Sequence, residues 1–339
     1  MNEIKVVLIG YGGIARAHHK GYRMLADEGE RVRLVAVCDV DPTRFATEMK
    51  INVDTGKEGL TGEIHTYTNV DELIEKEAFD MADICLPTYL HKEYAVKLMQ
   101  AGKHVLSEKP MALNLSDCDE MLRVSQETGM HLMIGQCLRF DAAYLYAKQC
   151  IDSGIYGKVQ HVFMHRLCAL PRWGFEHWFE DHKRSGGCLL DTHIHDVDMA
   201  RFWFGEPNAA STVSLDCEMR YQVQNTRLYY PNMLVSIDGS WNEANTAKFS
   251  SGFRIRFEKA TLLMDRNGIT VYPMEGSPFS PELPQINHMT EEIRAFCAVI
   301  RGAQNLKNPP ESARNTVALM ERLFESAAHD GEIVKLKNA

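Results

Sequence analysis

The amino-acid sequence predicts an α/β protein with a doubly wound parallel sheet in its first part and a large, open, mostly antiparallel sheet in its second. Up to about residue 136, short apolar runs alternate with helical patterns, which is typical of parallel strands joined by right-handed crossovers. From about residue 155, strand-like runs follow one another with little helix between them. A chain of 339 residues is long enough for two domains, which we place at residues 1–136 and 137–339.

The first element is a strand that leads into a glycine-rich turn. Val6 to Ile9 are all apolar, as in a strand that is covered on both faces. Gly10, Gly12 and Ala15 follow at the spacing G-x-G-x-x-[G/A]. Gly10 permits a sharp turn, Gly12 lets the backbone approach a pyrophosphate, and Ala15 lets the next helix pack closely. The pattern also occurs by chance in turns that bind nothing, so it needs support from the residues that follow.

Asp39 supplies that support, because it ends a second buried strand, residues 31–38, 24 positions after Ala15. A carboxylate there can accept hydrogen bonds from the adenosine ribose and repel the additional phosphate of NADP. The alternative is that Asp39 only caps a turn before Pro42. The order of strand, turn, helix and strand favours a nucleotide site, with NAD preferred over NADP.

The remaining elements of the first part continue the alternation. We expect a helix over about 42–50, an exposed loop over 54–62, and further strands whose carboxyl ends share one edge of the sheet, where ligands bind. The expected strands are residues 82–86, 104–107 and 131–135.

The second part predicts longer strands, one helical segment and two closing helices. The apolar and polar alternation between Arg227 and Met264 leaves a sheet face that the helices do not cover fully, which favours a homo-oligomer. The expected strands are residues 158–167, 209–217, 227–241, 248–257 and 260–264, and the expected helices are 189–204, 290–301 and 310–328.

Composition excludes several classes of protein. The net charge of −9 argues against nucleic acid as the main partner. The nine cysteines include no CxxC pair, so they indicate neither a disulfide framework nor a zinc site. Met1 leads almost directly into a buried strand, and no apolar run has the length of a membrane span. We therefore expect a cytoplasmic protein.

Two groups of residues could carry chemistry. Lys109 follows a strand end, where it can stabilise the alkoxide formed as hydride leaves a substrate, although a surface ion pair with Glu108 is an alternative. Asp191 and His195 are four residues apart in a helical pattern, so we expect them on one helical face. Together they could orient a hydroxyl group and take its proton. The alternatives are a metal site, a structural histidine or a solvated face, and we predict no metal because three useful ligands do not share that face.

In order and spacing, these motifs resemble the Gfo/Idh/MocA family of NAD(P)-dependent oxidoreductases, named for glucose-fructose oxidoreductase and inositol dehydrogenase. The resemblance implies a Rossmann domain, then an α/β domain whose open sheet supports dimers or tetramers. It also implies a catalytic lysine at Lys109 and a catalytic pair at Asp191 and His195. Cys188 departs from the family, where a third glycine is common. The segments that carry the resemblance are 10–15 with His18, 86–91, 101–110 and 186–195.

The expected contacts with NAD lie in the glycine turn and at three strand ends. They are Gly10, Gly12, Gly13, Ile14, Ala15, Asp39, Leu86, Pro87, Thr88, His91, Glu108 and Lys109. The expected substrate contacts are Arg139, Trp178, Asp191 and His195, although Trp178 and its neighbour Trp173 could equally be packing residues.

The expected function is hydride transfer between NAD(H) and a secondary alcohol carbon of a sugar or polyol. No basic cluster marks a phosphate pocket, so we expect an uncharged substrate. Two alternatives remain: a non-catalytic NAD-sensing regulator, as in the yeast galactose pathway, and a glycoside-processing enzyme that oxidises its substrate transiently. The presence of Lys109, Asp191 and His195 favours an enzyme. We assign His195 as the base for oxidation, with Lys109 as the rival base.

Overall fold

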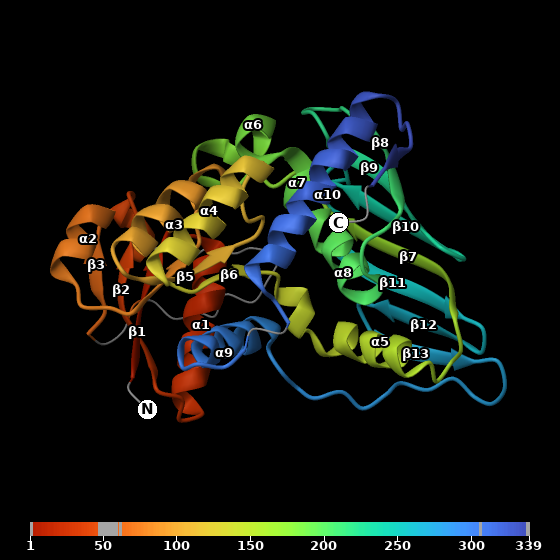
Figure 1. The fold of residues 1–339 in the computed structure, drawn as a ribbon, viewed down its shortest axis with the longest axis horizontal. Helices are drawn as coiled ribbons and strands as arrows, with labels where there is room; N and C mark the ends of the chain where they lie inside the picture. Colours follow the sequence, from red (N-terminus) through yellow and green to blue (C-terminus); the bar gives the residue numbers. More distant parts are fainter. Residues whose placement is uncertain (1–2, 47–59, 61–62, 305–306, 337–339) are drawn as a thin grey trace. The chain divides into compact units, whose positions relative to one another are not determined.

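The computed structural model describes residues 3–46, 60, 63–304 and 307–336. The chain divides into two compact units (Figure 1). The first comprises Met1–Phe140 and Ile286–Arg314, and the second comprises Asp141–Gln285 and Asn315–Ala339. Most of the expected loop at 54–62 and the end of the expected helix at 42–50 lie outside the described residues.

The first unit contains a six-stranded sheet in the order β3-β2-β1-β4-β5-β6, and every neighbouring pair is parallel. This confirms the predicted doubly wound sheet. The order reverses between β1 and β4, and in such sheets ligands bind outside the carboxyl ends of the strands at this point. The strands are β1 (Ile4–Ile9), β2 (Val32–Cys38), β3 (His65–Tyr67), β4 (Met81–Ile84), β5 (His104–Glu108) and β6 (Leu132–Gly135).

Helices pack in two groups around this sheet. The helix α1 lies beside α9, as Figure 1 shows, and both join the core that covers β1 and β2. Gly21 permits this close packing, since a Cβ there would lie 2.9 Å from Ile293 Cδ1. The helices α3 and α4 pack on each other. The helices of this unit are α1 (Gly13–Asp27), α2 (Val70–Lys76), α3 (His91–Gln100), α4 (Leu115–Thr128) and α9 (His288–Ile300). Short 3₁₀ turns are η1 (Pro42–Phe45), η2 (Thr88–Leu90) and η3 (Cys137–Phe140).

The second unit contains an eight-stranded mixed sheet in the order β13-β12-β11-β7-β10-β9-β8-β14. The pair β7 and β10 is parallel and the other neighbouring pairs are antiparallel, as predicted for a mostly antiparallel sheet. The strands are β7 (Val159–Leu167), β8 (Ala209–Leu215), β9 (Val223–Tyr230), β10 (Met233–Ser240), β11 (Ser250–Phe257), β12 (Ala260–Asp265), β13 (Gly268–Pro273) and β14 (Val334–Lys335).

One expected strand of this sheet was wrong. Residues 227–241 form parts of two strands, β9 and β10, which pair as a hairpin. The reason is the turn at Pro231 and Asn232, where Asn232 adopts a φ of 59°. Asparagine tolerates this left-handed conformation better than most residues, and proline favours the turn itself.

The two faces of the second sheet differ in burial. Val162 and Met164 on β7, like Val235 and Ile237 on β10, are completely buried. On the opposite face Leu234 is 49% exposed, because successive side chains of a strand point to opposite sides. The helices of this unit are α5 (Ala142–Ser153), α6 (His182–Ser185), α7 (Gly187–Asp191), α8 (Ile194–Phe204) and most of α10 (Pro310–Ala328), with the 3₁₀ segment η4 (Phe175–Glu180).

The compact units differ in extent from the domains expected at 1–136 and 137–339. Residues 286–314 belong with the first unit because α9 packs against α1, and α10 begins in one unit and ends in the other. The functional domain boundary stays a prediction.

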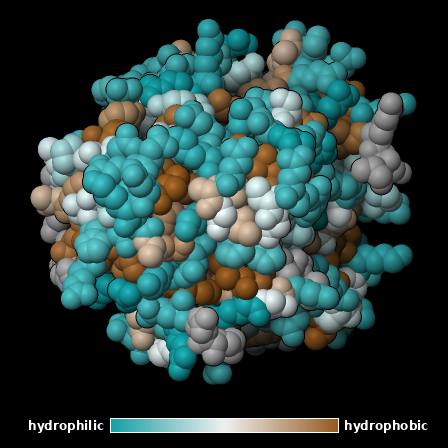
Figure 2. Space-filling model, turned by 60° about the vertical axis from the view of Figure 1, so that its left-hand side comes forward, coloured by the Kyte–Doolittle hydropathy of each residue, from teal (hydrophilic) through white to brown (hydrophobic). Residues whose placement is uncertain are grey.

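The face of the molecule seen in Figure 2 is mostly hydrophilic, with small hydrophobic patches between polar side chains. In the described part of the chain, no helix is both long enough and apolar enough to cross a membrane.

Candidate functional site

The glycine turn after β1 has the backbone that a pyrophosphate site requires. Gly10 has a φ of +85°, and a Cβ on it would lie 2.7 Å from the Cys85 carbonyl oxygen. Gly12 precedes α1 as its N-cap without any side-chain cap, and a Cβ on it would meet nothing within 4 Å. Ala15 is completely buried. The first amides of α1 therefore face open space beside Gly12, an arrangement that suits an anion.

Asp39 lies beside this turn, directly after β2. Its Oδ2 accepts a hydrogen bond from the Tyr11 amide at 2.7 Å, and its Oδ1 accepts one from the Asp41 amide at 2.9 Å. A carboxylate has about four acceptor positions, so both oxygens can accept further bonds from a ribose diol. The guanidinium Nε of Arg44 lies 3.4 Å from Asp41 Oδ2, and this ion pair partly offsets the positive charge of Arg44. The geometry fits the adenosine ribose of a dinucleotide.

The loop after β4 brings Leu86, Pro87, Thr88 and His91 to the same end of the sheet. Thr88 is buried, and its Oγ1 has no hydrogen-bond partner among the described residues. His91 is also buried, and its ring nitrogens each lie 2.8 Å from a carbonyl oxygen, Nδ1 from Pro110 and Nε2 from Leu86. His91 therefore joins the loops that follow β4 and β5. Its predicted contact with the cofactor stays a prediction, since both ring nitrogens already lie beside carbonyl oxygens of these loops.

Glu108 and Lys109 end β5 with their side chains in different surroundings. The Glu108 carboxylate is buried, with Oε1 3.1 Å from His18 Nε2 and Oε2 3.1 Å from the Lys109 amide nitrogen. Burial alone would raise the pKa of Glu108, but the hydrogen bond and charge of His18 lower it below the usual value. Lys109 is half-buried at the carboxyl end of the strand. Lys109 is therefore the more accessible of the two.

Asp191 and His195 do not share one helical face, which corrects the expectation from their spacing. The helix α7 ends at Asp191 and α8 begins at Ile194. The amide of His193 donates to the Cys188 carbonyl at 2.9 Å, five residues back instead of four. Both predicted catalytic side chains remain partly exposed.

Tertiary contacts of the two intervening residues account for this break. His193 is completely buried, with Nε2 2.8 Å from Thr226 Oγ1 on β9. Trp241 Nε1 donates to Thr192 Oγ1 at 2.7 Å. Burial lowers the pKa of His193 to about 3, so this ring stays neutral near neutral pH.

The other acidic residues of this segment make an ion pair and a hydrogen bond within the protein. Asp196 is buried and pairs with Arg166 at 3.1 Å, and Asp198 accepts a hydrogen bond from Thr316 Oγ1 at 2.7 Å. These contacts occupy two side chains that the alternative of a metal site near Asp191 would require.

Two residues predicted to bind substrate are buried. Arg139 is 2% exposed, and its guanidinium donates to the Lys307 carbonyl at 2.9 Å and to Ser312 Oγ at 2.8 Å. Trp178 is 8% exposed and stacks on Phe179, whereas Trp173 is 41% exposed. Trp173 is thus the tryptophan of this segment that offers an open ring face. The substrate contacts of Arg139 and Trp178 stay predictions.

Sequence reasoning missed the buried acids of the first unit. Asp83 lies within β4 and is completely buried beside His18, and Glu292 of α9 is also completely buried. The signal was present for Asp83, since a charged residue between Ala82 and Ile84 is unusual in a buried strand. His18, Asp83 and Cys85 form the one group in the described ranges with metal-ligand types close together. Burial raises the pKa of the Cys85 thiol to about 12, which opposes a thiolate ligand.

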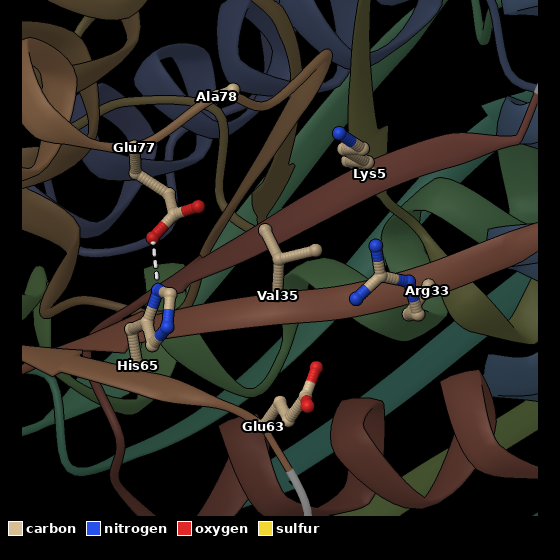
Figure 3. A pocket seen from close by; sticks show the side chains of 7 residues that line it. All are labelled: Lys5, Arg33, Val35, Glu63, His65, Glu77 and Ala78. Atoms are coloured by element: carbon tan, nitrogen blue, oxygen red, sulfur yellow. Dashed lines mark hydrogen bonds and ion pairs between the residues drawn. The ribbon is translucent and has the colours of Figure 1, made fainter.

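An open cavity of about 400 Å³ lies elsewhere on the first unit (Figure 3). Its polar side chains include Lys5 near the start of β1 and His65, whose Nδ1 lies 2.6 Å from Glu77 Oε2. None of the predicted site residues lines it, so we assign it no part in the chemistry. The lining residues are Lys5, Arg33, Val35, Glu63, His65, Glu77 and Ala78.

Comparison with known proteins agrees with the two-part architecture. Residues 4–136 match the family described as the oxidoreductase family with an NAD-binding Rossmann fold, and residues 144–263 match the GFO/IDH/MocA C-terminal domain. The chain belongs to the Gfo/Idh/MocA family. This membership confirms an oxidoreductase family fold with an NAD(P)-binding Rossmann domain.

Individual relatives within the Gfo/Idh/MocA family differ in activity. The chain is 35% identical over 185 residues to 2,7-anhydro-N-acetylneuraminate hydratase of Mediterraneibacter gnavus, covering 52% of this chain and 44% of the hydratase. It is 32% identical over 203 residues to myo-inositol 2-dehydrogenase of Thermotoga maritima, covering 60% of this chain and 55% of that enzyme. The matched region thus spans about half the length of these relatives.

A solved structure shows the same fold over the whole chain. The WlbA dehydrogenase from Bordetella pertussis, in complex with NADH and UDP-GlcNAcA, superposes with a TM-score of 0.79, 20% identity and coverage of 100% of both chains. At this identity the likeness concerns the fold alone.

Proposed function

We propose that this protein is an NAD-dependent dehydrogenase that transfers a hydride between NAD(H) and a secondary alcohol carbon of an uncharged sugar or polyol. The observation that carries the proposal is the position of Lys109, which is half-buried at the carboxyl end of β5, the end where Rossmann domains bind their cofactor. The myo-inositol 2-dehydrogenase among the relatives supports a polyol substrate.

The residues of the first unit would bind the cofactor and assist at the reacting oxygen. The uncapped amides of α1 at Gly12 bind the pyrophosphate, and Asp39 accepts hydrogen bonds from the adenosine ribose. When bound, NAD supplies the hydride acceptor of the reaction. Lys109 donates a hydrogen bond to the substrate oxygen and stabilises the negative charge that develops on it.

Two residues of the second unit complete the proposal. His195 takes the proton of the substrate hydroxyl during oxidation, and Asp191 holds that hydroxyl. Both side chains are partly exposed, and a break in the helix separates them. The rival assignment makes Lys109 the base and His195 a residue that only orients the substrate.

Partners and location follow the same logic. Val213 and Leu215 of β8 are 59% and 58% exposed on the open sheet face, which supports burial against a second copy of the chain. Eight of the nine cysteines are buried and none of the nine forms a disulfide bond, as suits a protein of the reducing cytoplasm. We propose a cytoplasmic homodimer or homotetramer that acts on a small molecule and not on nucleic acid.

The test is a screen of sugars and polyols with NAD, following NADH by its absorbance. We expect one class of polyol or sugar to produce NADH with the native protein and not with a Lys109→Met variant. If NAD binds but none of the alcohols is oxidised by the native protein, the non-catalytic NAD-sensing alternative is favoured and the dehydrogenase proposal fails.

A second candidate is favoured by the hydratase among the relatives. An enzyme of this kind would oxidise its substrate transiently, eliminate the leaving group, add water, and return the hydride from NADH to the substrate. The same residues would serve this reaction. Incubating anhydro sugars and glycosides with catalytic NAD separates the two. Product that forms without net NADH indicates the hydratase type, whereas NADH in equal amount to product indicates a dehydrogenase.

A further inference from the structure

Four polar side chains meet in the interior of the first unit, and one of them accepts a hydrogen bond from the backbone of Lys109. His18 and Tyr22 come from successive turns of α1, Asp83 comes from β4, and Glu108 ends β5. His18 and Asp83 are completely buried, and Tyr22 and Glu108 are only 2% and 7% exposed. These residues are called the His18 network below.

The hydrogen bonds of this network define the charge on His18. Its Nδ1 lies 2.8 Å from Asp83 Oδ2, and its Nε2 lies 3.1 Å from Glu108 Oε1. Ionised carboxylates only accept hydrogen bonds, so both ring nitrogens must donate and the ring is an imidazolium. Burial alone would lower the pKa of His18, but the negative charge of Asp83 raises it well above the usual value of 6.5.

Two further hydrogen bonds involve the carboxylates of this network, one at Asp83 and one at Glu108. Tyr22 donates its hydroxyl to Asp83 Oδ2 at 2.7 Å, and the Lys109 amide donates to Glu108 Oε2 at 3.1 Å. A chain of hydrogen bonds therefore runs from the backbone of Lys109 to the Glu108 carboxylate, and from there to the ring of His18 on α1.

A buried ionic network is weak evidence for a role in stability. Apolar side chains of similar volume often make a protein equally or more stable than buried ion pairs do, because charges lose hydration on burial. An ionic network does hold its groups in one geometry, since each donor has a particular acceptor. The group whose geometry is held at its end is Lys109.

We propose that His18 is a positioning residue for Lys109: it holds the Glu108 carboxylate inside the protein, and Glu108 holds the backbone that presents the Lys109 side chain. The inference rests on the proposed function, in which Lys109 meets the reacting oxygen. Asp83 and Tyr22 act one step further away by orienting the His18 ring.

The first test compares His18→Gln with the matched control His104→Gln. His104 lies at the other end of β5, half-buried, where its Nδ1 accepts from the His131 amide. We expect His18→Gln to lower kcat about 10²-fold, as small misplacements of catalytic groups do, with the dissociation constant of NAD changed less than about twofold. The control should keep the native kcat. An equal loss in both variants, or weaker NAD binding that accounts for the loss, would overturn the inference.

A second measurement does not depend on turnover. The Lys109 amide should exchange its hydrogen at least about tenfold faster in His18→Gln than in the native protein, because local opening governs such exchange. Faster exchange in a protein that oxidises no alcohol would refute the proposed function and leave the network intact. Unchanged exchange in an active protein would refute the network alone.

Asp83→Asn provides a variant in case His18→Gln does not fold. Asparagine keeps an acceptor for the Tyr22 hydroxyl but removes the negative charge that raises the pKa of His18. The nitrogen NMR signals of the His18 ring should show imidazolium at neutral pH in the native protein and neutral imidazole, or a mixture, in the variant. An imidazole spectrum in the native protein, or a stoichiometric metal ion bound by His18, Asp83 and Cys85, would contradict the inference.

Discussion

Glu108 and Glu292 flank Gly135, so closely that a Cβ on this glycine would lie 3.3 Å from Glu108 Oε1 and 3.4 Å from Glu292 Oε1. Glu292 is completely buried, and neither of its carboxyl oxygens has a hydrogen-bond partner among the described residues. Burial, together with the negative charges of Glu108 and Asp83, raises the pKa of Glu292 well above 4.5, although His18 opposes this. Two carboxyl groups in one interior therefore have pKa values shifted in opposite directions, upward for Glu292 and downward for Glu108.

The raised pKa of Glu292 predicts a pH-dependent gain in stability for Glu292→Gln. Because the pKa is raised in the folded state, the contribution of Glu292 to stability is fully present below about pH 4.5 and is lost as the pH rises toward the folded pKa. Glutamine carries no such proton. We expect the difference in unfolding free energy between Glu292→Gln and the native protein to move in favour of the variant by up to about 1.4 kcal/mol per pH unit in this window.

Urea unfolding between about pH 5 and pH 8 would measure this difference. Glu291→Gln is the matched control, since Glu291 is partly exposed beside Arg294 on the same helix. The control should show little change with pH. A constant difference between Glu292→Gln and the native protein would mean that Glu292 is ionised in the folded state.

Cofactor preference should depend on Asp39. We expect the native enzyme to favour NAD over NADP, and Asp39→Asn to reduce the ratio of their kcat/KM values by about tenfold or more, which corresponds to about 1.4 kcal/mol. The variant keeps an oxygen acceptor but removes the charge that repels the additional phosphate. A native preference for NADP would show that Arg44 or another cation overrides Asp39.

Lys109→Met should remove turnover while leaving the cofactor bound. The loss in kcat should be about 10²-fold or more, as for the removal of other donors that stabilise a developing negative charge. The dissociation constant of NAD, measured by fluorescence titration, should remain near the native value because Gly12 and Asp39 are unchanged. A variant with most of its turnover would exclude Lys109 from the chemistry.

The assignment of His195 as the base predicts a particular pH profile. We expect kcat/KM for oxidation to rise with pH through one ionisation and then level off, and the reverse reaction to favour the acidic side. His195→Gln should be slower by about 10² to 10⁴ and lose that ionisation. The neighbouring His193 cannot supply it, since burial lowers its pKa to about 3. An unchanged profile in His195→Gln would favour Lys109 as the base.

The exposed apolar residues of the second sheet predict association. Light scattering at micromolar concentration should give a multiple of 38.5 kDa. Leu234→Lys should lower that mass, because Leu234 is 49% exposed on β10 and a buried lysine at an interface is costly. A native mass near 38.5 kDa would show that this face is open to water in solution.

Features that depend on neighbouring residues could be predicted from the amino-acid sequence. A strand, a glycine turn and a helix follow directly from Val6 to Ala15, since apolar runs and glycine spacing act locally. Asp39 lies beside this turn because consecutive parallel strands bring their carboxyl ends together. The same alternation predicted the parallel sheet.

Features that depend on distant partners could not be predicted in this way and emerge from the folded chain. The helix between Asp191 and His195 breaks because His193 and Thr192 bond to Thr226 and Trp241, which no helical period encodes. The buried titratable groups near Glu108 come from chain positions as far apart as 18 and 292, and their protonation depends on burial and on each other. Charge states of this kind arise only once folding has removed water from the groups and placed them within hydrogen-bonding distance.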